Sequence, residues 1–490
     1  MAIERAATGS ARPRLAVIGG GITGLAASHR VVERARDRVD VVLFEADRRL
    51  GGVIETERSG ERLLESGPDS FVVDKPWALD LCRRIGLEDR LVPTNERFRR
   101  TLAVHRGRLA ELPETFQLMA PGRLGPFLRT PLLSWRGKLV ALKDLVLPRG
   151  GPPAGGDESL ASFVRRRLGS EVLERIAQPL VGGIYTADPE VLSLAATMPR
   201  FLEMERRNRS IVLSLMRQNR SASTAGTSGA RFGLFLTLRG GIGELVDALA
   251  ARLPPGSARM STAVTGLERG PDETYVLRLA GGAEERFDAA LVALPAPRAA
   301  ALLAGLDAEL AAGLREIEYA SSAIVSLVYR TSDLREPVDA FGFVVPHAEG
   351  RRLIAASFSN IKYPGRAPEG ELVVRAFVGG ALQPDLARLD DDAMSRAVRE
   401  ELGDLLGIAS EPLLMRIRRH PESMPQYRVG HLGRVVALQA RAERHRGLAL
   451  AGNAYHGVGL PDCIRSGEAA ADALLHRLGV VDGASVPETT

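Results

Sequence analysis

Apolar residues near the N-terminus of the chain fall into two short, almost uninterrupted runs with a helical pattern between them. The runs cover residues 15–18 and 39–44, and their aliphatic character is typical of parallel strands that are buried on both faces. The segment 25–36 between the runs has the pattern of a helix. This order of strand, helix and strand predicts the beginning of a doubly wound α/β sheet.

Further along the chain the pattern changes twice. A helix opening at Pro76 is followed, from about residue 98, by a small hairpin at 106–113 and then by mainly helical sequence. An alternation of strand and helix returns near residue 234, and from about residue 301 short strands separated by turns predict a mostly antiparallel sheet. The later elements that we expect are strands at 234–238, 262–267, 275–279, 289–294, 323–329, 342–345, 353–358, 372–378 and 448–451, and helices at 393–406 and 461–477.

The turn after the first strand has the spacing of a dinucleotide-binding motif. Gly19, Gly21 and Gly24 fit G-x-G-x-x-G, in which glycines allow a tight turn, the approach of a pyrophosphate and close packing of helix on strand. Glu45 ends the second run at the position of a ribose-binding carboxylate, although a strand can also end on an acid for no functional reason. The following R-x-G-G, with Arg49 and Gly52, continues this pattern in flavoproteins and favours FAD over NAD.

Two other segments carry hypotheses. The segment 117–146 mixes large apolar residues with arginine and lysine, a composition that covers a core or lies on a membrane surface, and we favour the core. The segment 178–185 contains a proline and paired glycines. We predict that it breaks helicity and lets the backbone approach a ligand.

Composition limits the function classes. The 490 residues carry a formal charge of +5 without a dense basic run, so nothing indicates nucleic acid as a partner. Only two cysteines are present, Cys82 and Cys463, and neither they nor the histidines have metal-ligand spacing, so we expect no metal. No apolar run is long enough to span a membrane and the N-terminus has no signal-peptide pattern, which predicts a cytoplasmic protein.

Several motifs, in order, make the chain resemble the porphyrinogen oxidases, the FAD enzymes of haem synthesis. They are residues 19–24, Gly-Pro-Asp-Ser-Phe at 67–71, Gly-Ile-Tyr at 183–185, 342–346, Pro-Gln-Tyr at 425–427 with 430–432, and 452–464. Two positions depart from the family's usual residues: Pro461 replaces a frequent Asn, and His420 replaces a frequent Trp.

The resemblance implies a flavin amine oxidase-like fold, α/β in its nucleotide domain and α+β overall. A Rossmann-type FAD-binding domain would be built from 11–97, 232–300 and 428–480, a mainly helical domain from 98–231, and a substrate-binding mixed-sheet domain from 301–427. The residues implied to contact FAD are Gly19, Gly20, Gly21, Ile22, Thr23, Gly24, Glu45, Ala46, Arg49, Gly52, Gly67, Pro68, Asp69, Ser70, Val264, Val458, Gly459 and Leu460. Gly183, Val344 and Tyr363 would line the substrate cleft, together with Lys75.

The implied reaction oxidises a porphyrinogen to the aromatic porphyrin, with oxygen as acceptor and hydrogen peroxide as product. The flavin would be noncovalent, and the protein a monomer or homodimer with weak peripheral membrane contact as an option. Lys75 is one of only four lysines and follows the 67–70 loop, which favours coproporphyrinogen III, with four propionates, over protoporphyrinogen IX, with two. Alternatives are a flavin amine oxidase, a carotenoid desaturase-like enzyme, or a non-catalytic FAD-binding protein.

Overall fold

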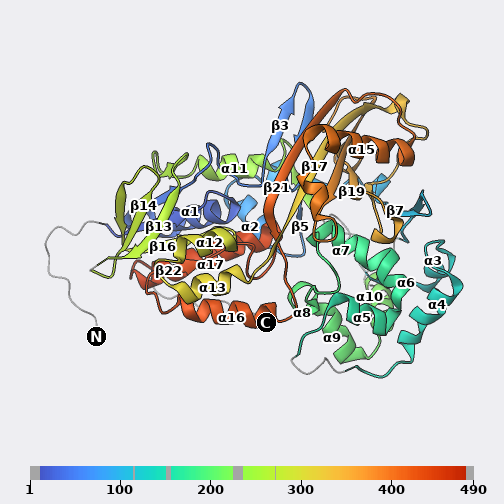
Figure 1. The fold of residues 1–490 in the computed structure, drawn as a ribbon, viewed down its shortest axis with the longest axis horizontal. Coiled ribbons are helices and arrows are strands. Elements are labelled where there is room, and N and C mark those ends of the chain that lie inside the picture. The colour runs from blue at the N-terminus through green and yellow to red at the C-terminus, as the bar shows by residue number, and fades with distance from the viewer. Residues whose placement is uncertain are drawn as a thin grey trace. The chain divides into compact units, whose positions relative to one another are not determined.

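The structure is a computed structural model that describes residues 12–113, 116–117, 119–150, 156–224, 235–270 and 272–481. It divides into two compact units, each built from separated chain segments (Figure 1). Unit 1 contains residues 1–52, 245–316 and 435–490, and unit 2 contains residues 53–244 and 317–434. The three functional domains expected from the sequence, with their boundaries, stay a prediction.

Unit 1 is organised around a five-stranded parallel sheet in the order β12-β2-β1-β16-β22. The central strands consist of small and branched apolar residues that are almost completely buried, as the uninterrupted runs predict. The strands are β1 (Arg14–Ile18), β2 (Asp40–Phe44), β12 (Ala258–Arg259), β16 (Ala289–Val292) and β22 (Leu448–Leu450). The predicted runs at 15–18, 39–44, 289–294 and 448–451 are therefore confirmed as strands.

Helices and a small antiparallel sheet complete unit 1. The helix α1 (Ile22–Ala35) follows β1, and α17 (Leu460–Arg477) follows β22 and packs against α1. The other elements are α12 (Ala296–Leu303), α13 (Ala308–Arg315), most of α11 (Gly243–Ala250) and α16 (His431–Ala442), and the meander β13 (Val264–Arg269), β14 (Tyr275–Leu279) and β15 (Glu284–Phe287).

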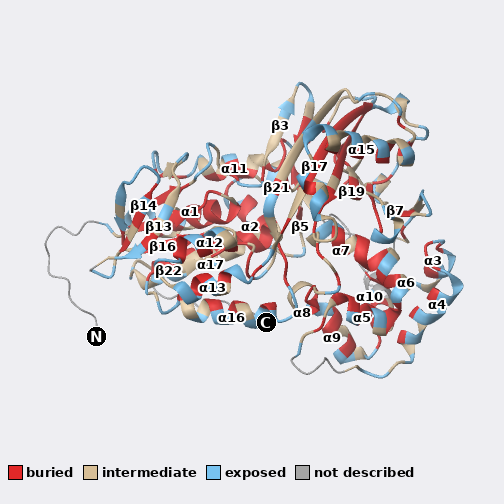
Figure 2. Cartoon of the chain, in the orientation of Figure 1, coloured by how far each residue is buried: buried red, intermediate tan, exposed pale blue. Residues whose placement is uncertain are grey.

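Unit 2 contains a seven-stranded sheet in the order β21-β17-β20-β19-β18-β7-β8. All its neighbouring strands are antiparallel except β18 and β7, which confirms the mostly antiparallel sheet. The strands are β7 (Thr101–His105), β8 (Arg108–Glu111), β17 (Tyr319–Arg330), β18 (Gly342–Val344), β19 (Leu353–Phe358), β20 (Glu371–Gly379) and β21 (Leu414–Pro425). The helix α15 (Asp391–Leu406) packs its apolar side on this sheet, and Figure 2 shows the buried residues along β17.

The remaining elements of unit 2 are short strands and helices. The strands are β3 (Thr56–Ser59) with β4 (Arg62–Glu65), β5 (Phe71–Val72) and β6 (Leu91–Pro93) on either side of β11 (Phe235–Leu238), and β9 (Phe116–Gln117) with β10 (Ala120–Pro121). The helices are α2 (Trp77–Arg84), α3 (Leu124–Arg129), α4 (Trp135–Leu142), α5 (Leu160–Leu168), α6 (Ser170–Val172), α7 (Gln178–Tyr185), α8 (Leu194–Thr197), α9 (Pro199–Asn208), α10 (Ile211–Thr224) and α14 (Ser359–Lys362).

The prediction that residues 178–185 break helicity is wrong, because they form the helix α7. Pro179 lies in the first turn of α7, where its missing N–H costs little. The preceding residues, Leu173–Ala177, form a π-helical turn, so the regular hydrogen-bond ladder is already interrupted where the proline enters. The backbone instead departs from the helix at Thr186, which has a left-handed conformation with φ of 48°.

A buried ion network joins the helices between residues 144 and 205. Arg167 donates to Asp144 at 2.7 Å, and both side chains are almost fully buried. Arg166 donates to Glu158 at 2.6 Å and to Glu205 at 2.6 and 2.7 Å. We call these five residues the helical network. Since each buried charge has an opposite partner, the network fixes how α5 and α9 pack.

Candidate functional site

The glycine turn of unit 1 has the geometry of a dinucleotide cradle. The helix α1 begins after Gly21 with no side-chain cap and no acidic residue in its first turn, which leaves its N–H groups and positive dipole end available for an anion. A Cβ on Gly24 would lie 1.9 Å from the carbonyl oxygen of Gly19, so only glycine permits this turn. A Cβ on Gly21 would meet no atom within 4 Å, so a phosphate has room to approach.

Glu45 and Arg49 are both oriented by backbone groups next to this turn. The carboxylate of Glu45 accepts the N–H of Gly20 at 2.7 Å and that of Asp47 at 2.8 Å. Arg49 donates to the carbonyl oxygens of Leu50 at 3.2 Å and Gly52 at 2.5 Å, which closes the turn that follows. Both side chains are half-buried. The structure therefore brings the predicted acid and the R-x-G-G turn to the glycine motif.

The segment before β13 runs alongside the same acid. The carbonyl oxygen of Glu45 accepts the N–H of Thr262 at 2.8 Å. The backbone N–H of Glu45 donates to the carbonyl oxygen of Arg259 at 2.9 Å. Val264 follows Thr262 by two residues and begins β13, and Ala46 is exposed.

The helix α17 begins within the family motif at 452–464. Its N-cap is Gly459, without a side-chain cap, and Pro461 occupies the first turn. The buried Asp462 also lies in that turn, so the positive dipole end already faces a carboxylate of its own helix. Cys463 is buried and forms no disulfide. Val458 and Leu460, which the resemblance implies as FAD contacts, flank this N-cap.

In unit 2 the loop at 67–70 is held by a buried and a partly buried cation, Arg375 and Lys362. Asp69 accepts from the Lys362 ammonium at 3.1 Å and pairs with Arg375 at 3.0 Å, and it also accepts the Ser70 hydroxyl at 2.7 Å. Burial alone would raise the pKa of Asp69, but Lys362 and Arg375 outweigh it and hold that pKa well below its usual range. The Asp69 carboxylate is therefore ionised and fixed.

Two further side chains hold the carbonyl groups of this loop. Arg375 donates to the carbonyl oxygen of Gly67, and the Nε2–H of His420 donates to that of Ser66 at 2.7 Å. Burial lowers the pKa of His420, and Arg418 and Arg375 lower it further, so the imidazole is neutral. His420, which departs from the family's usual Trp, thus still has a polar task here.

Tyr363 and Arg366 extend the same cluster. The ring of Tyr363 is buried, with the Lys362 ammonium 5.1 Å and the Arg366 guanidinium carbon 5.7 Å from its centroid. Burial, and then the Asp69 charge, raise the pKa of the Tyr363 phenol, which stays protonated. Arg366 donates to Thr237 at 2.8 Å. With the buried Glu65, these residues form what we call the Asp69 cluster: Glu65, Asp69, Lys362, Arg366 and Arg375.

The other predicted substrate residues divide into a pair and a separate lysine. A Cβ on Gly183 would lie 4.0 Å from Cγ1 of Val344, so α7 and β18 meet at these two residues. Lys75 is half-buried in the turn between β5 and α2. The structure thus groups Gly183 with Val344, and Tyr363 with Asp69.

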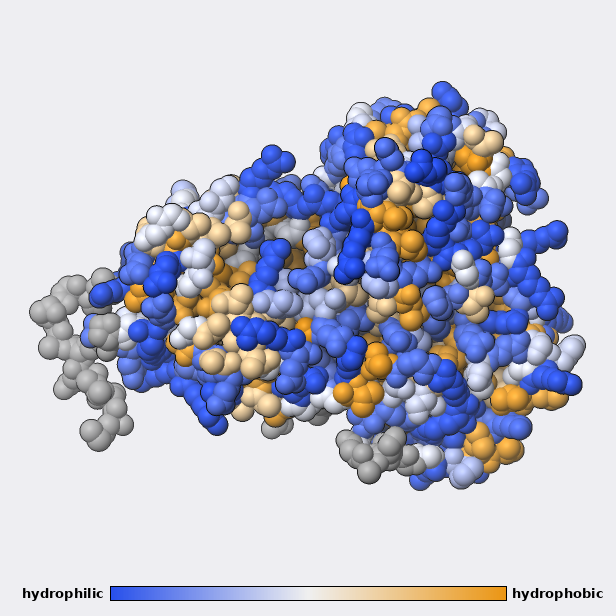
Figure 3. Space-filling model, in the orientation of Figure 1, coloured by the Kyte–Doolittle hydropathy of each residue, from blue (hydrophilic) through white to orange (hydrophobic). Residues whose placement is uncertain are grey.

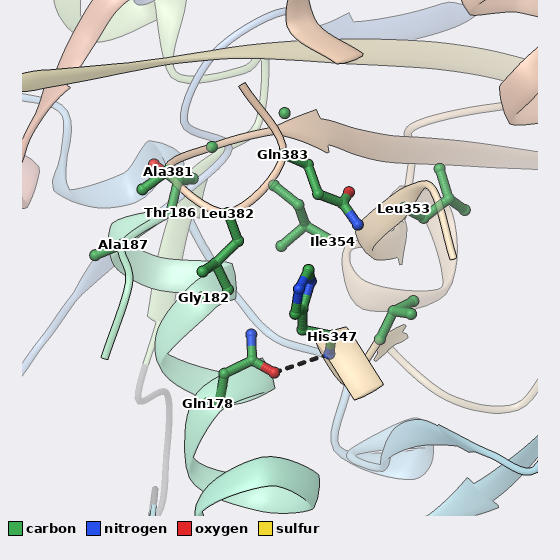
Figure 4. A pocket seen from close by; sticks show the side chains of 13 residues that line it. Gln178, Gly182, Thr186, Ala187, His347, Leu353, Ile354, Ala381, Leu382 and Gln383 are labelled. Atoms are coloured by element: carbon green, nitrogen blue, oxygen red, sulfur yellow. Dashed lines mark hydrogen bonds between the residues drawn. The ribbon is translucent and has the colours of Figure 1, made fainter. Parts of the chain in front are cut away.

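A small cavity lies beside the Gly183–Val344 contact (Figure 4). It is lined by Gln178 and Gly182 of α7 and by residues of β19 and of the turn after β20, and Gln178 accepts the backbone N–H of His347 at 2.9 Å. Its volume of about 20 Å³ suits a water molecule rather than a tetrapyrrole. A larger hollow of about 620 Å³ in unit 1 lies at the amino end of β2, opposite the glycine turn, so it is not the cradle.

Sequence reasoning missed Lys362, Arg375 and Arg366 and selected Lys75 instead. Arg375 carried a signal, because it interrupts the apolar run of β20, and a charge inside a buried strand requires a partner. Lys362 directly precedes Tyr363, which the resemblance had already singled out. No group of side chains among the described residues has the arrangement of a metal site.

Comparison with known proteins identifies the class to which this fold and site belong. The family model of flavin containing amine oxidoreductases matches residues 22–475, and the chain belongs to this family. It is 36% identical to the coproporphyrinogen III oxidase of Propionibacterium freudenreichii subsp. freudenreichii, over 94% of this chain and 90% of the relative. It is 34% identical to the coproporphyrinogen III oxidase of Bacillus subtilis, over 95% of this chain and 98% of the relative.

A solved structure agrees with this assignment. A crystal structure from Exiguobacterium sp. 255-15, whose protein carries the provisional name protoporphyrinogen oxidase, superimposes with a TM-score of 0.84 at 31% identity. The match covers 95% of this chain and 99% of that one. The predicted flavin amine oxidase-like fold and the resemblance to porphyrinogen oxidases are both confirmed, and a flavin is the cofactor of the family.

Proposed function

We propose that the protein catalyses the FAD-dependent oxidation of a porphyrinogen to the corresponding porphyrin, with release of hydrogen peroxide. The similarity to two coproporphyrinogen III oxidases over nearly the whole length of both partners carries this proposal. The cation-braced loop at 67–70, whose sequence is one of the family's motifs, supports it from the structure.

The described residues fit FAD. Gly19 to Gly24 offer uncapped helix N–H groups to a pyrophosphate, and Glu45 presents a carboxylate beside them for a ribose hydroxyl. We propose contacts from Arg49, Gly52, Val264 and the 458–460 segment as well. We propose that no cysteine bonds covalently to the flavin. Cys463 is the cysteine next to the 458–460 segment, and it is buried within the first turn of α17. When bound, the flavin supplies the electron-accepting chemistry, and molecular oxygen restores it.

The chain's own residues would mainly bind, orient and exclude water. Aromatisation drives removal of hydrogen from the porphyrinogen, so little acid–base work is required of the protein. Two groups in and beside the Asp69 cluster fit this requirement, because each keeps one protonation state: Asp69 stays ionised and the neighbouring Tyr363 stays protonated. We assign Asp69, Lys362 and Arg375 as positioning residues for the loop, and Gly183, Val344 and Tyr363 as cleft-lining residues.

The test is oxidation of coproporphyrinogen III by the purified, flavin-containing protein. Mixed without oxygen, the substrate should bleach the flavin absorbance, and air should restore it while porphyrin fluorescence rises. An unchanged flavin, or a porphyrin yield equal to autoxidation, would refute the proposal. An amine oxidase would instead be bleached by a primary amine, and a non-catalytic flavoprotein by neither compound. Acid precipitation should leave the flavin in the supernatant, whereas a yellow pellet would refute noncovalent binding.

For substrate preference we propose coproporphyrinogen III over protoporphyrinogen IX, with Lys75 as the contact to a propionate. Lys75→Met should then lower kcat/KM about 10-fold or more for coproporphyrinogen III and less for protoporphyrinogen IX, since a hydrogen bond to a charged group contributes about 1.5–3 kcal/mol. Lys143→Met, a change at the exposed lysine that directly follows α4, is the matched control. Equal losses on both substrates would exclude this role for Lys75.

A further inference from the structure

The arginine at the start of α9 has hydrogen-bond donors that the fold leaves unused. Arg200 follows Pro199, the first residue of that helix. Among the residues that the structure describes, no hydrogen bond or ion pair engages its guanidinium group, whose carbon lies 4.9 Å from the centroid of the Phe201 ring. Phe201 is the next residue of α9 and is fully buried. The N–H groups of Arg200 are therefore available to a ligand.

An arginine on the surface is not by itself evidence of a site. Hydrophilic side chains, drawn blue in Figure 3, cover much of the face of the molecule shown there. Arg200 differs from an ordinary surface arginine in its surroundings. Its side chain is open to solvent, yet enough protein surrounds it for burial to lower the pKa of the guanidinium group, which stays charged. This combination is typical of a side chain in a concave part of a surface, where a ligand can reach it.

Two acidic groups, the carboxylate of Asp74 and the phenol of Tyr185, act on the charge of Arg200. Both raise the pKa of its guanidinium group, although burial lowers that pKa by more, so both groups lie near it. Tyr185 is the last residue of α7, and its hydroxyl donates to the carbonyl oxygen of Thr197, the last residue of α8, at 3.3 Å. Asp74 directly precedes Lys75 in the turn between β5 and α2. The start of α9, the end of α7 and that turn therefore meet around Arg200.

Residues predicted to line the substrate cleft lie on both of the segments that meet α9. Gly183, which meets Val344, belongs to the last turn of α7, and the neighbouring Ile184 is exposed to 46%. Lys75 belongs to the turn between β5 and α2. This part of unit 2 thus has an exposed apolar side chain and two cations, Arg200 and Lys75, which outnumber the single carboxylate beside them. A ligand with an apolar face and carboxylates at its rim fits such a set.

We propose that Arg200 binds a propionate of the porphyrinogen, in addition to the propionate contact proposed for Lys75. This inference rests on the proposed function and adds to it a second substrate-binding cation from a different element. A guanidinium group can hold a carboxylate by two parallel hydrogen bonds, whereas a lysine provides a single point charge. Contacts at two places on the rim would fix the rotation of the ring within the cleft, which one contact cannot do.

The first test measures binding and needs no turnover. Coproporphyrin III, the oxidised ring with the same propionates, is titrated into the flavin-containing protein, and the change in porphyrin fluorescence gives the Kd. Arg200→Met should raise this Kd about 10-fold, because it removes a charge-assisted contact, and Arg200→Lys should raise it less. Arg206→Met, at another exposed arginine of α9, should leave it unchanged.

The tetramethyl ester of coproporphyrin III is the matched control ligand, because its propionates carry no charge. Wild type and Arg200→Met should bind the ester equally. An unchanged Kd for coproporphyrin III in Arg200→Met, or an equal loss for the acid and the ester, would overturn the proposal. Unchanged flavin absorbance and Tm would show that each variant is folded.

Steady-state kinetics separate the role of Arg200 from the proposed function. With coproporphyrinogen III, Arg200→Met should raise KM about 10-fold and change kcat less than about 2-fold, because the propionate contact is the same before and during the reaction. If wild type oxidises the substrate and the variant keeps both its KM and its Kd, only the role of Arg200 is wrong. If wild type does not oxidise it, the proposed function fails, and a Kd that still depends on Arg200 would support the propionate contact without the reaction.

Discussion

The Asp69 cluster and the helical network are both sets of five charged, mostly buried residues in unit 2, yet the balance of positive and negative charge differs between them. The helical network has three carboxylates and two arginines, and its guanidinium groups are used on carboxylates and backbone carbonyls. The Asp69 cluster has three cations and two carboxylates, and Nε of Arg375 and Nη1 of Arg366 have no hydrogen-bond partner among the described residues. A satisfied network ties helices together, whereas an excess of buried positive charge with unused donors suits a place that receives an anion.

We expect the largest effect from replacing one arginine in each set, Arg167 in the helical network and Arg375 in the Asp69 cluster. Arg167→Met should destabilise the protein by about 3–5 kcal/mol, because it leaves the buried Asp144 without its cationic partner. Arg375→Met should also destabilise it, but by less, because Asp69 keeps Lys362 as a partner. Thermal unfolding measures this loss. Only Arg375→Met should also weaken FAD binding, measured by flavin fluorescence at a temperature where both variants are folded. If Arg167→Met weakened FAD binding as much, the proposed difference between the two networks would be wrong.

Lys362 should give an intermediate effect. Lys362→Met removes one charge-assisted bond to Asp69, worth about 1.5–3 kcal/mol, and leaves Arg375 as the remaining partner. We expect kcat/KM for the porphyrinogen to fall about 10- to 100-fold in a steady-state assay, with Lys362→Arg restoring part of it. Lys143→Met serves again as the control. A fall in Tm without a fall in kcat/KM would assign Lys362 to stability alone.

The smallest effect concerns pH. Because burial lowers the pKa of His420, the unfolded chain binds a proton more readily than the folded one, so this residue's contribution to stability is lost as pH falls below about 6.5. His420→Gln keeps an N–H donor for the carbonyl of Ser66 but does not titrate. The difference in Tm between wild type and variant should correspond to less than about 1 kcal/mol at pH 7. It should shrink, or reverse, towards pH 5, and a difference independent of pH would contradict the assignment.

The sequence was most informative where one local rule determines structure. The parallel strands, the glycine turn and the position of Glu45 follow from short stretches of chain, and the structure brings them together. The strand β21 was missed, because it is an edge strand whose arginines and prolines give it the pattern of a loop. The helix α7 was missed because a proline is tolerated in a first turn.

The Asp69 cluster could not be predicted for a different reason. Its members come from residues 65–69 and 362–375, almost 300 positions apart, and only the fold brings them together. The sequence drew attention to Lys75 because lysine is rare in this chain and lies near the motif. The role proposed for Lys75 stays a prediction, whereas the structure pairs a different lysine, Lys362, with Asp69. The roles of the individual site residues stay predictions until the variants are measured.

The arrangement of unit 1 also affects how the protein is made. Its first strand is translated at residues 14–18, but β16 and β22, which complete the sheet on one side of β1, follow only at 289–292 and 448–450. The nascent chain therefore exposes a partial sheet for most of synthesis, with its apolar strand edges open to chaperones or to aggregation. We expect FAD to be captured late, after α17 has left the ribosome. The supply of flavin should therefore change how much folded protein is obtained, and it should not change the early folding steps of the nascent chain.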